Sequence, residues 1–112
     1  MKFTNTKGTR TFPVHGTQAA RFLAALLAAL QINPLLAWRD FGIYRVSYVV
    51  FRLRKLGWPV ITADLAVSNR FGEECIVALY SLPHEAIEEA GTEGQEFVRA
   101  ERETLRDMRR AA

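Results

Sequence analysis

Side chains suited to contact nucleic acid are concentrated between residues 41 and 57. A helix from about Ile43 to Leu56, turning about 100° per residue, would gather polar and basic groups on one side. The side chains that we expect to contact DNA from this helix are Tyr44, Arg45, Ser47, Tyr48, Arg52 and Lys55. Such residues can donate hydrogen bonds to base edges in the major groove and to phosphate oxygens. The pattern therefore predicts a surface for DNA.

The opposite side of the same helix has the spacing of a buried stripe. Its apolar residues recur at intervals of three and four and are Val46, Val49, Val50, Leu53 and Leu56. Phe51 falls on the polar side, where we expect it to touch thymine methyl groups, a partner or another part of the chain. An ordinary amphipathic helix with a solvated basic side is the alternative interpretation.

The residues before this helix predict a shorter helix and a sharp turn. Asn33 is a good N-cap, and Pro34 suits the first helical position because its missing N–H needs no partner there. Gly42 can adopt the left-handed conformation that ends a helix. Together the two segments have the outline of a helix-turn-helix, in which one helix supports a second helix in the major groove.

A resemblance to a known family is carried by residues 41 to 60, which read Phe-Gly-Ile-Tyr-Arg-Val-Ser-Tyr-Val-Val-Phe-Arg-Leu-Arg-Lys-Leu-Gly-Trp-Pro-Val. This run resembles the recognition helix and wing entry of a small winged helix-turn-helix family of phages and other mobile elements. The broader winged-helix regulators of the multiple-antibiotic-resistance type share its valines and leucine followed by a glycine. By this resemblance, residues 43 to 56 are the recognition helix and residues 58 to 82 the wing.

The resemblance covers about residues 17 to 82 and implies the fold class. We expect an α+β, mainly α, protein: a three-helix winged helix-turn-helix with a two-stranded β-hairpin wing and a charged C-terminal helix. Winged helices also serve as protein-interaction modules, so fold and function are separate expectations.

The remaining elements of that domain can be placed from local signals. Thr17 can cap a first helix containing the apolar run Phe22 to Leu30. Two segments rich in Val, Ile, Thr and Leu, Trp58 to Ala66 and Glu74 to Leu82, predict a hairpin. We expect Cys75 to be a small buried residue of its second strand.

The hairpin tip offers two further DNA contacts, Asn69 and Arg70. A wing tip can lie along the backbone or enter the minor groove. Glu73 and Glu74 follow the tip directly and would repel phosphate, so a plain polar turn is the alternative.

Both ends of the chain lie outside the expected domain, which spans residues 17–82. Residues 1–16 form a basic N-terminal arm, either a minor-groove arm or a frayed terminus. Residues 83–112 form a charged helical extension in which Phe97, Glu101, Leu105 and Met108 make a thin seam. This seam predicts pairing with a second copy, and a solvated tail is the alternative interpretation. The domain core is expected to be complete by about Leu82.

Charge is distributed unevenly along the 112 residues. Residues 1–57 contain nine basic residues and a single acid, a net charge of +8, whereas residues 58–112 have a net charge of −5. The basic half contains the predicted helix-turn-helix, which favours nucleic acid as partner. Membrane binding is disfavoured because the apolar stripe of the basic helix is committed to a core.

The sequence contains few signals for export, membrane insertion, metal binding or catalysis. The single cysteine excludes an intramolecular disulfide, and the longest apolar run is too short to span a bilayer, so we expect a cytoplasmic protein. His15 and His84 have no metal-ligand spacing with Cys75, and adjacent carboxylates such as Glu88 and Glu89 point apart. We therefore expect no enzyme activity, no metal and no cofactor.

The sequence thus predicts a sequence-specific double-stranded DNA-binding protein, a homodimer that regulates transcription for a phage or mobile element. The alternative is a winged-helix interaction module that targets a host or partner protein.

Overall fold

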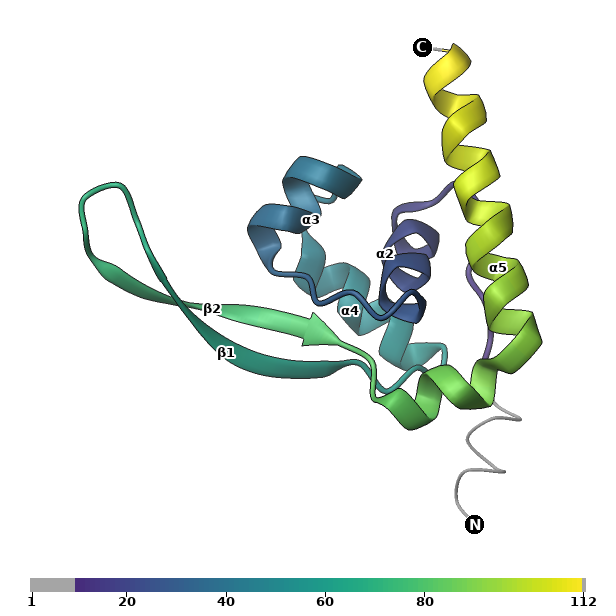
Figure 1. The fold of residues 1–112 in the computed structure, drawn as a ribbon, viewed down its shortest axis with the longest axis horizontal. Coiled ribbons are helices and arrows are strands. Elements are labelled where there is room, and N and C mark those ends of the chain that lie inside the picture. Colours follow the sequence, from purple (N-terminus) through teal and green to yellow (C-terminus); the bar gives the residue numbers. More distant parts are fainter. Residues whose placement is uncertain (1–9, 112) are drawn as a thin grey trace.

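The computed structural model describes residues 10–111, with side chains described through residue 107. Its elements in chain order are α2 (Gln18–Leu27), α3 (Pro34–Phe41), α4 (Val46–Lys55), β1 (Ile61–Ser68), β2 (Glu74–Ser81) and α5 (His84–Ala111). Helices predominate and one antiparallel hairpin projects from them (Figure 1), in agreement with the predicted fold class. Predictions that concern residues 1–9 or the side chain of Met108 lie outside the described residues.

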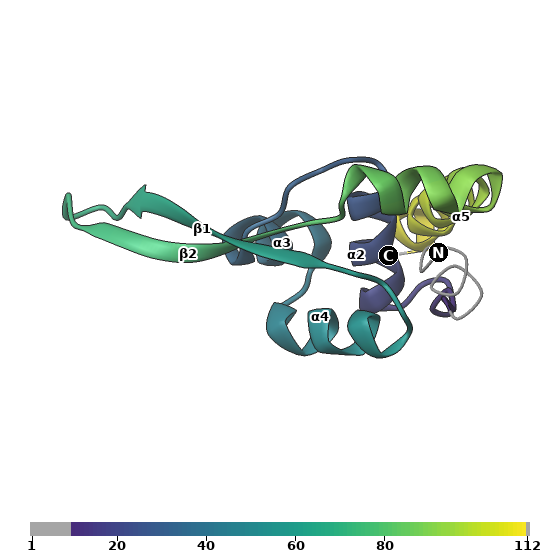
Figure 2. The same ribbon diagram turned by 90° about the horizontal axis from the view of Figure 1, so that it is seen from below.

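Helix α2 is the centre of the molecule, between α4 on one side and α5 on the other (Figures 1 and 2). Thr17 caps it as predicted, since Thr17 Oγ1 accepts a hydrogen bond from Ala20 N at 3.2 Å. Phe22, Leu23 and Leu26 are fully buried because helices cover α2 on more than one side. The helix stops before Leu30, which is 48 % exposed.

Helix α3 follows its predicted start and end signals. Asn33 Oδ1 accepts from Leu36 N at 2.8 Å, Pro34 is the first helical residue, and Gly42 has the left-handed φ of 66°. Ile32, just before α3, exchanges backbone hydrogen bonds of 2.9 and 2.8 Å with Tyr80 of β2. This bridge attaches the base of the hairpin to the helices.

The hairpin begins later than predicted, at Ile61 and not at Trp58. Trp58 is 2 % exposed and belongs to the helical core, where its Nε1 donates to Thr11 O at 2.9 Å. The strands then run antiparallel from Ile61 opposite Ser81 to Ser68 opposite Glu74. Cys75 is half-buried, contrary to the expected full burial, because this part of the hairpin lies away from the helices (Figure 2).

The described part of the N-terminal segment packs on the body of the protein. The ring of Phe12 lies 5.2 Å from that of Trp58 and 4.9 Å from that of Phe97. Thr11 N donates to Leu56 O at 2.9 Å. Residues 10–16 therefore form a strap that connects the end of α4 with α5.

Helix α5 completes the core, so the expectation that the core ends near Leu82 is wrong. Ala86 and Phe97 are buried, and α5 packs along α2. Glu101 is completely buried, with its Oε1 2.8 Å from His15 Nδ1 and both carboxylate oxygens 3.3 Å from Gly16 N. Phe97 and Glu101 thus face their own chain, and the seam predicted to pair with a second copy is already occupied there.

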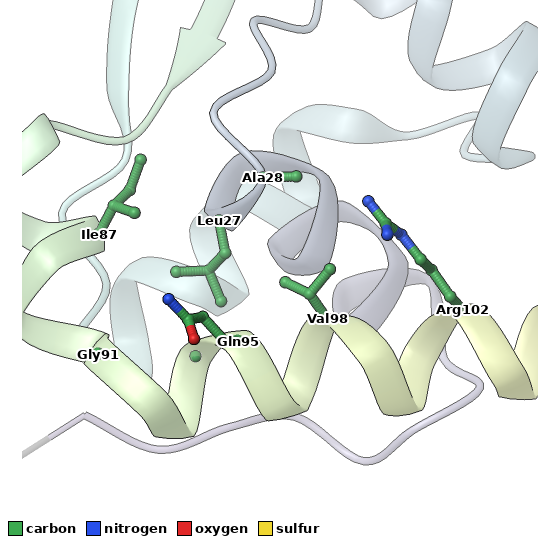
Figure 3. Close-up of a pocket in the computed structure, with 8 residues that line it drawn as sticks. Leu27, Ala28, Ile87, Gly91, Gln95, Val98 and Arg102 are labelled. Atoms are coloured by element: carbon green, nitrogen blue, oxygen red, sulfur yellow. The ribbon is translucent and has the colours of Figure 1, made fainter.

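A bend at Gly91, with φ 53° and ψ −137°, lets α5 wrap around the end of α2. Between the bend and α2 remains a cavity of about 400 Å³, into which Leu27 and Val98 point (Figure 3). Gln95 and Arg102 supply polar groups to its lining. Helix α2 separates this cavity from α4.

Candidate nucleic-acid interface

The position of α4 is set by the turn that precedes it. Gly42 N donates to Trp38 O at 3.2 Å and Ile43 N to Ala37 O at 3.0 Å, so both residues close the end of α3. Arg21 of α2 also donates from Nε to Phe41 O at 2.9 Å, and this hydrogen bond attaches the C-terminal end of α3 to α2. Ile43 is fully buried and anchors the turn in the core.

Helix α4 consequently starts at Val46, three residues later than predicted. Arg45 is the N-cap residue, with φ −108° and ψ 70°, and no side chain caps the helix. Tyr44 and Arg45 therefore lie in the turn before the helix, because Ile43 is held by α3 and by the core. They still lie next to the N-terminus of α4.

The predicted division of α4 into two sides is confirmed by burial. Val46, Val49, Val50 and Leu53 are buried, and Leu56 just after the helix is half-buried. The six predicted contact residues of this region are all exposed: Tyr44, Arg45, Ser47, Tyr48, Arg52 and Lys55. We call these six residues the α4 surface. Their contacts with DNA remain a prediction.

The N-terminus of α4 is open to an anion. Its first turn contains no acidic residue and no side-chain cap. Unpaired N–H groups and the helix dipole make such an end attractive to phosphate. Arg45 beside it adds a full positive charge, so the charge here is suited to a DNA backbone.

Not every basic residue of α4 is free to bind a partner. Arg54 donates from Nε and Nη2 to Val60 O at 3.2 and 2.8 Å, and from Nη2 to Thr62 Oγ1 at 2.9 Å. Arg54 therefore fastens α4 to the base of β1. Arg52 makes only a long bond of 3.4 Å to the hydroxyl of Tyr48, which an incoming phosphate can replace.

Aromatic side chains extend the α4 surface toward α3. The rings of Trp38 and Tyr44 pack edge to face with centroids 5.7 Å apart, yet Trp38 is 57 % and Tyr44 80 % exposed. Phe51 is 53 % exposed, and Lys55 Nζ lies 5.4 Å from its ring centre. Trp38 was not among the predicted contact residues. It lies three residues after Leu35, so the two share one side of α3, and both are exposed while Ala37 is buried. Helical spacing could therefore have indicated that Trp38 is exposed.

The one acid of residues 1–57 is neutralised locally. Arg39 Nε donates to Asp40 Oδ1 at 3.0 Å, and this hydrogen bond, with the attraction of the guanidinium charge, lowers the pKa of Asp40. Asp40 is thus ionised at neutral pH but is paired with Arg39. No other acid of this half opposes the positive charge of the α4 surface.

The hairpin tip is separate from the α4 surface. Figure 1 shows that the tip, which holds Asn69 and Arg70, lies at the far end of the projecting hairpin. Asn69 organises the turn: its Oδ1 accepts from Phe71 N at 2.9 Å and Glu73 N at 3.1 Å, and its Nδ2 donates to Glu73 Oε1 at 2.9 Å. Arg70 is exposed and is the stronger candidate for a contact at this tip.

The arrangement of α3, turn, α4 and hairpin corresponds to a known family. The profile described as a winged helix-turn-helix domain matches residues 17–85, which span α2 to the first residues of α5. The chain belongs to this winged helix-turn-helix family. No curated protein and no solved structure matches the chain.

Family membership assigns roles to the elements. In winged helix-turn-helix domains the second helix of the motif typically enters the major groove, and α4 is the corresponding helix of this chain. The hairpin β1–β2 corresponds to the wing. The family points to DNA as partner and to binding as the activity, since its domains are typically not enzymes. Helix α5 lies largely beyond the matched residues.

Two further features of the described residues bear on function. No helix among residues 10–111 combines the length and apolarity that crossing a bilayer requires. Within the same part of the chain, no three His, Cys, Asp or Glu side chains are grouped so that they could hold a metal ion.

Proposed function

We propose that this winged helix-turn-helix protein binds double-stranded DNA sequence-specifically and regulates transcription in a phage or mobile element, working in the cytoplasm. The observation that carries the proposal is the α4 surface. Its six exposed polar and basic side chains lie on α4 and in the turn before it, four of them near an uncapped helix N-terminus, and this family places the corresponding helix in the major groove.

Within this proposal the α4 surface has two parts. Tyr44, Arg45, Ser47 and Tyr48, near the N-terminus of α4, read base edges, because N-terminal residues of a recognition helix enter the groove most deeply. Arg52 and Lys55, one to two turns later, bind phosphates. At the wing, Arg70 contacts the backbone or the minor groove, and Asn69 holds the turn that presents it.

Salt dependence is the first test of the proposal. Fluorescence anisotropy with a random duplex should show affinity that falls steeply as salt rises, because each bound phosphate releases counterions. Replacing both Arg52 and Lys55 by Ala should reduce the slope by about two ion equivalents. A slope unchanged by the double variant would contradict the assigned phosphate contacts.

Sequence specificity needs a second measurement. Selection of bound genomic fragments, or direct binding to the intergenic DNA beside the protein's own gene, should identify an operator. Binding to that DNA should exceed binding to the random duplex by about 10³-fold or more. Equal affinity for every duplex would leave general DNA binding but remove the regulatory proposal.

A second candidate function rests on the exposed apolar residues of α3 and α4. Leu35 and Trp38 of α3 are 67 % and 57 % exposed, and Phe51 of α4 is 53 % exposed. Aromatic residues are enriched in protein interfaces, so a host or partner protein is the alternative target. Absence of any salt-dependent binding to duplex DNA would favour this alternative.

We also propose that the protein acts as a homodimer. Dimers of helix-turn-helix proteins bind half-sites about one helical turn apart, and operators then have two-fold symmetry. Because Phe97 and Glu101 are occupied within their own chain, the dimer requires a different surface.

A further inference from the structure

Exposed aromatic side chains are concentrated on α3, on α4 and in the turn between them. Trp38, Tyr44, Tyr48 and Phe51 lie there, and each is more than half exposed. Among the described residues only one other aromatic side chain is exposed, that of Phe71 in the turn between β1 and β2. We call the first four residues the aromatic patch.

The rings of the aromatic patch follow the direction of α4. Trp38 and Tyr44 are in edge-to-face contact at the N-terminal end of the helix. Tyr48 and Phe51 are three residues apart in α4, so they lie on one side of the helix and about one turn, or 5.4 Å, apart along its axis. Isolated exposed apolar residues are common in soluble proteins, whereas neighbouring ones mark a binding surface.

Cations lie beside the rings of α4. Arg52 Nη1 donates to the hydroxyl of Tyr48 at 3.4 Å, and Lys55 Nζ lies 5.4 Å from the ring centre of Phe51. These four residues are separated by three or four positions and therefore share one side of the helix. No acidic residue occurs between residues 41 and 57. The surface thus combines aromatic rings with positive charge that no neighbouring acid neutralises.

A partner that covers this surface must offer flat ring faces and negative charge together. An apolar protein surface could cover the rings, but it would remove Arg52 and Lys55 from water without a counter-charge, which costs free energy. Nucleic acid offers both properties, because its bases have aromatic faces and its phosphates are anionic. The combination therefore favours nucleic acid over an apolar protein.

Base faces are accessible only where DNA is unpaired. In a duplex the bases cover one another, and the grooves present base edges. Phe51 has no hydrogen-bonding group, so in a major groove it can only touch thymine methyl groups. In a single strand the faces are free, and proteins bind such strands by stacking bases on aromatic side chains beside a positively charged groove.

We propose that the protein also binds single-stranded DNA, with bases stacked on the aromatic patch and phosphates bound by Arg52 and Lys55. This activity goes beyond the proposed binding of duplex DNA. Both ligands use the same side of α4, so a single strand and a duplex exclude each other.

The first experiment separates stacking from charge. Fluorescence anisotropy compares an oligothymidylate, which does not pair with itself, with an abasic strand of equal length that has the same phosphates but no bases. The oligothymidylate should bind about ten-fold or more tightly, because stacking contributes strongly for every base that is held. Unlabelled random duplex should displace it from the full-length protein.

The second experiment tests a ring of the aromatic patch against a ring outside it. Phe51→Ala should weaken oligothymidylate binding about five-fold or more, and Phe51→Tyr should retain it because tyrosine also stacks. Phe71→Ala is the matched control, since it removes the same exposed side chain from the hairpin tip. Affinity of Phe51→Ala for random duplex should change by less than about two-fold, because phosphate contacts dominate non-specific binding.

Trp38 provides an optical measurement of stacking. It is exposed, whereas Trp58, the other tryptophan of the chain, is buried. A base stacked on Trp38 should quench its fluorescence as oligothymidylate is added. Trp38→Phe should remove this quenching and retain most of the affinity, because phenylalanine can still stack.

Equal affinities for the oligothymidylate and the abasic strand would overturn the proposal. So would equal effects of Phe51→Ala and Phe71→Ala, tryptophan fluorescence that saturating oligothymidylate leaves unchanged, or a duplex that does not displace the single strand. The proposed duplex binding is measured separately. It can persist when stacking fails, and its own failure would appear as oligothymidylate binding without salt-dependent binding of duplex.

Discussion

Arg45 and Arg54 are separated by nine residues, and their guanidinium groups have different surroundings. Arg45 precedes α4 and is exposed, whereas Arg54 donates three hydrogen bonds to Val60 and Thr62. At the scale of the residue, position in the sequence does not distinguish a side chain that stabilises the fold from one that is available to a partner. The hydrogen bonds that each side chain makes in the folded protein distinguish the two.

Arg45→Ala should weaken binding to specific DNA at least several-fold while the melting temperature stays unchanged. A bidentate arginine contact to guanine contributes on the order of 1 to 3 kcal/mol of discrimination. Arg54→Ala, as control, should lower the free energy of unfolding by about 1 kcal/mol. Specific DNA bound equally well by Arg45→Ala and the parent would show that Arg45 does not read bases.

Glu101→Ala should destabilise the fold by about 2 kcal/mol or more, because the buried carboxylate holds the N-terminal strap through His15 and Gly16. Glu103→Ala is the control, since Glu103 is exposed on the same helix. Urea unfolding measures both. Similar unfolding midpoints for the two variants would mean that the strap does not depend on this carboxylate.

At the scale of the element, α5 shows how packing can oppose a local preference. Glycine is a poor helix former, so replacing it inside a helix by alanine normally stabilises. Gly94 is buried in α5, and a Cβ built there would lie 2.7 Å from Ala90 Cβ and 3.7 Å from Leu27 Cδ2. The bend at Gly91 brings these atoms together.

Gly94→Ala should therefore destabilise the protein by about 1 to 3 kcal/mol, the usual range for overpacking, although helix propensity alone predicts a gain of about 1 kcal/mol. Arg99→Ala, at an exposed position of α5, should change stability by less than about 0.5 kcal/mol. The free energies of unfolding of both variants, measured by chemical denaturation, show whether overpacking or helix propensity dominates at Gly94. A stabilised Gly94→Ala variant would show that the helix relaxes around the new methyl group.

At the scale of the whole molecule, α5 and the strap make the body larger than the matched family domain. The profile ends at residue 85, but Phe97 and Glu101 are buried beyond it. Helix α2 is apolar on most of its surface and needs cover from α5 as well as from α4. The winged helix-turn-helix domain is therefore not independent of the C-terminal segment.

Deleting residues 91–112 should abolish cooperative unfolding by heat. Phe97→Ala alone should cost about 3 to 5 kcal/mol, a large fraction of the roughly 5 to 15 kcal/mol that stabilises a typical domain. Circular dichroism melts measure both changes. A truncated chain that melts cooperatively near the parent temperature would restore the expectation that the core is complete by about Leu82.

The sequence by itself determined the parts of this protein that depend on neighbours along the chain. Thr17, Asn33 and Gly42 mark helix ends because their caps bind backbone groups within four residues. The stripe of Val46, Val49 and Leu53 follows from helical spacing alone. The exposed side of α4 could also be predicted, because it depends on the same helical spacing. The resemblance to winged helices was visible for a similar reason, since a continuous run of residues carries it.

Tertiary structure decided the features that depend on distant segments. Helix α4 begins three residues later than predicted because α3 and the core hold Ile43. The apolar seam of α5 faces its own chain because α2 and residues 12–16 pack against it. Spacing reveals that an element has an apolar side, but which surface covers that side is decided by segments far away in the chain.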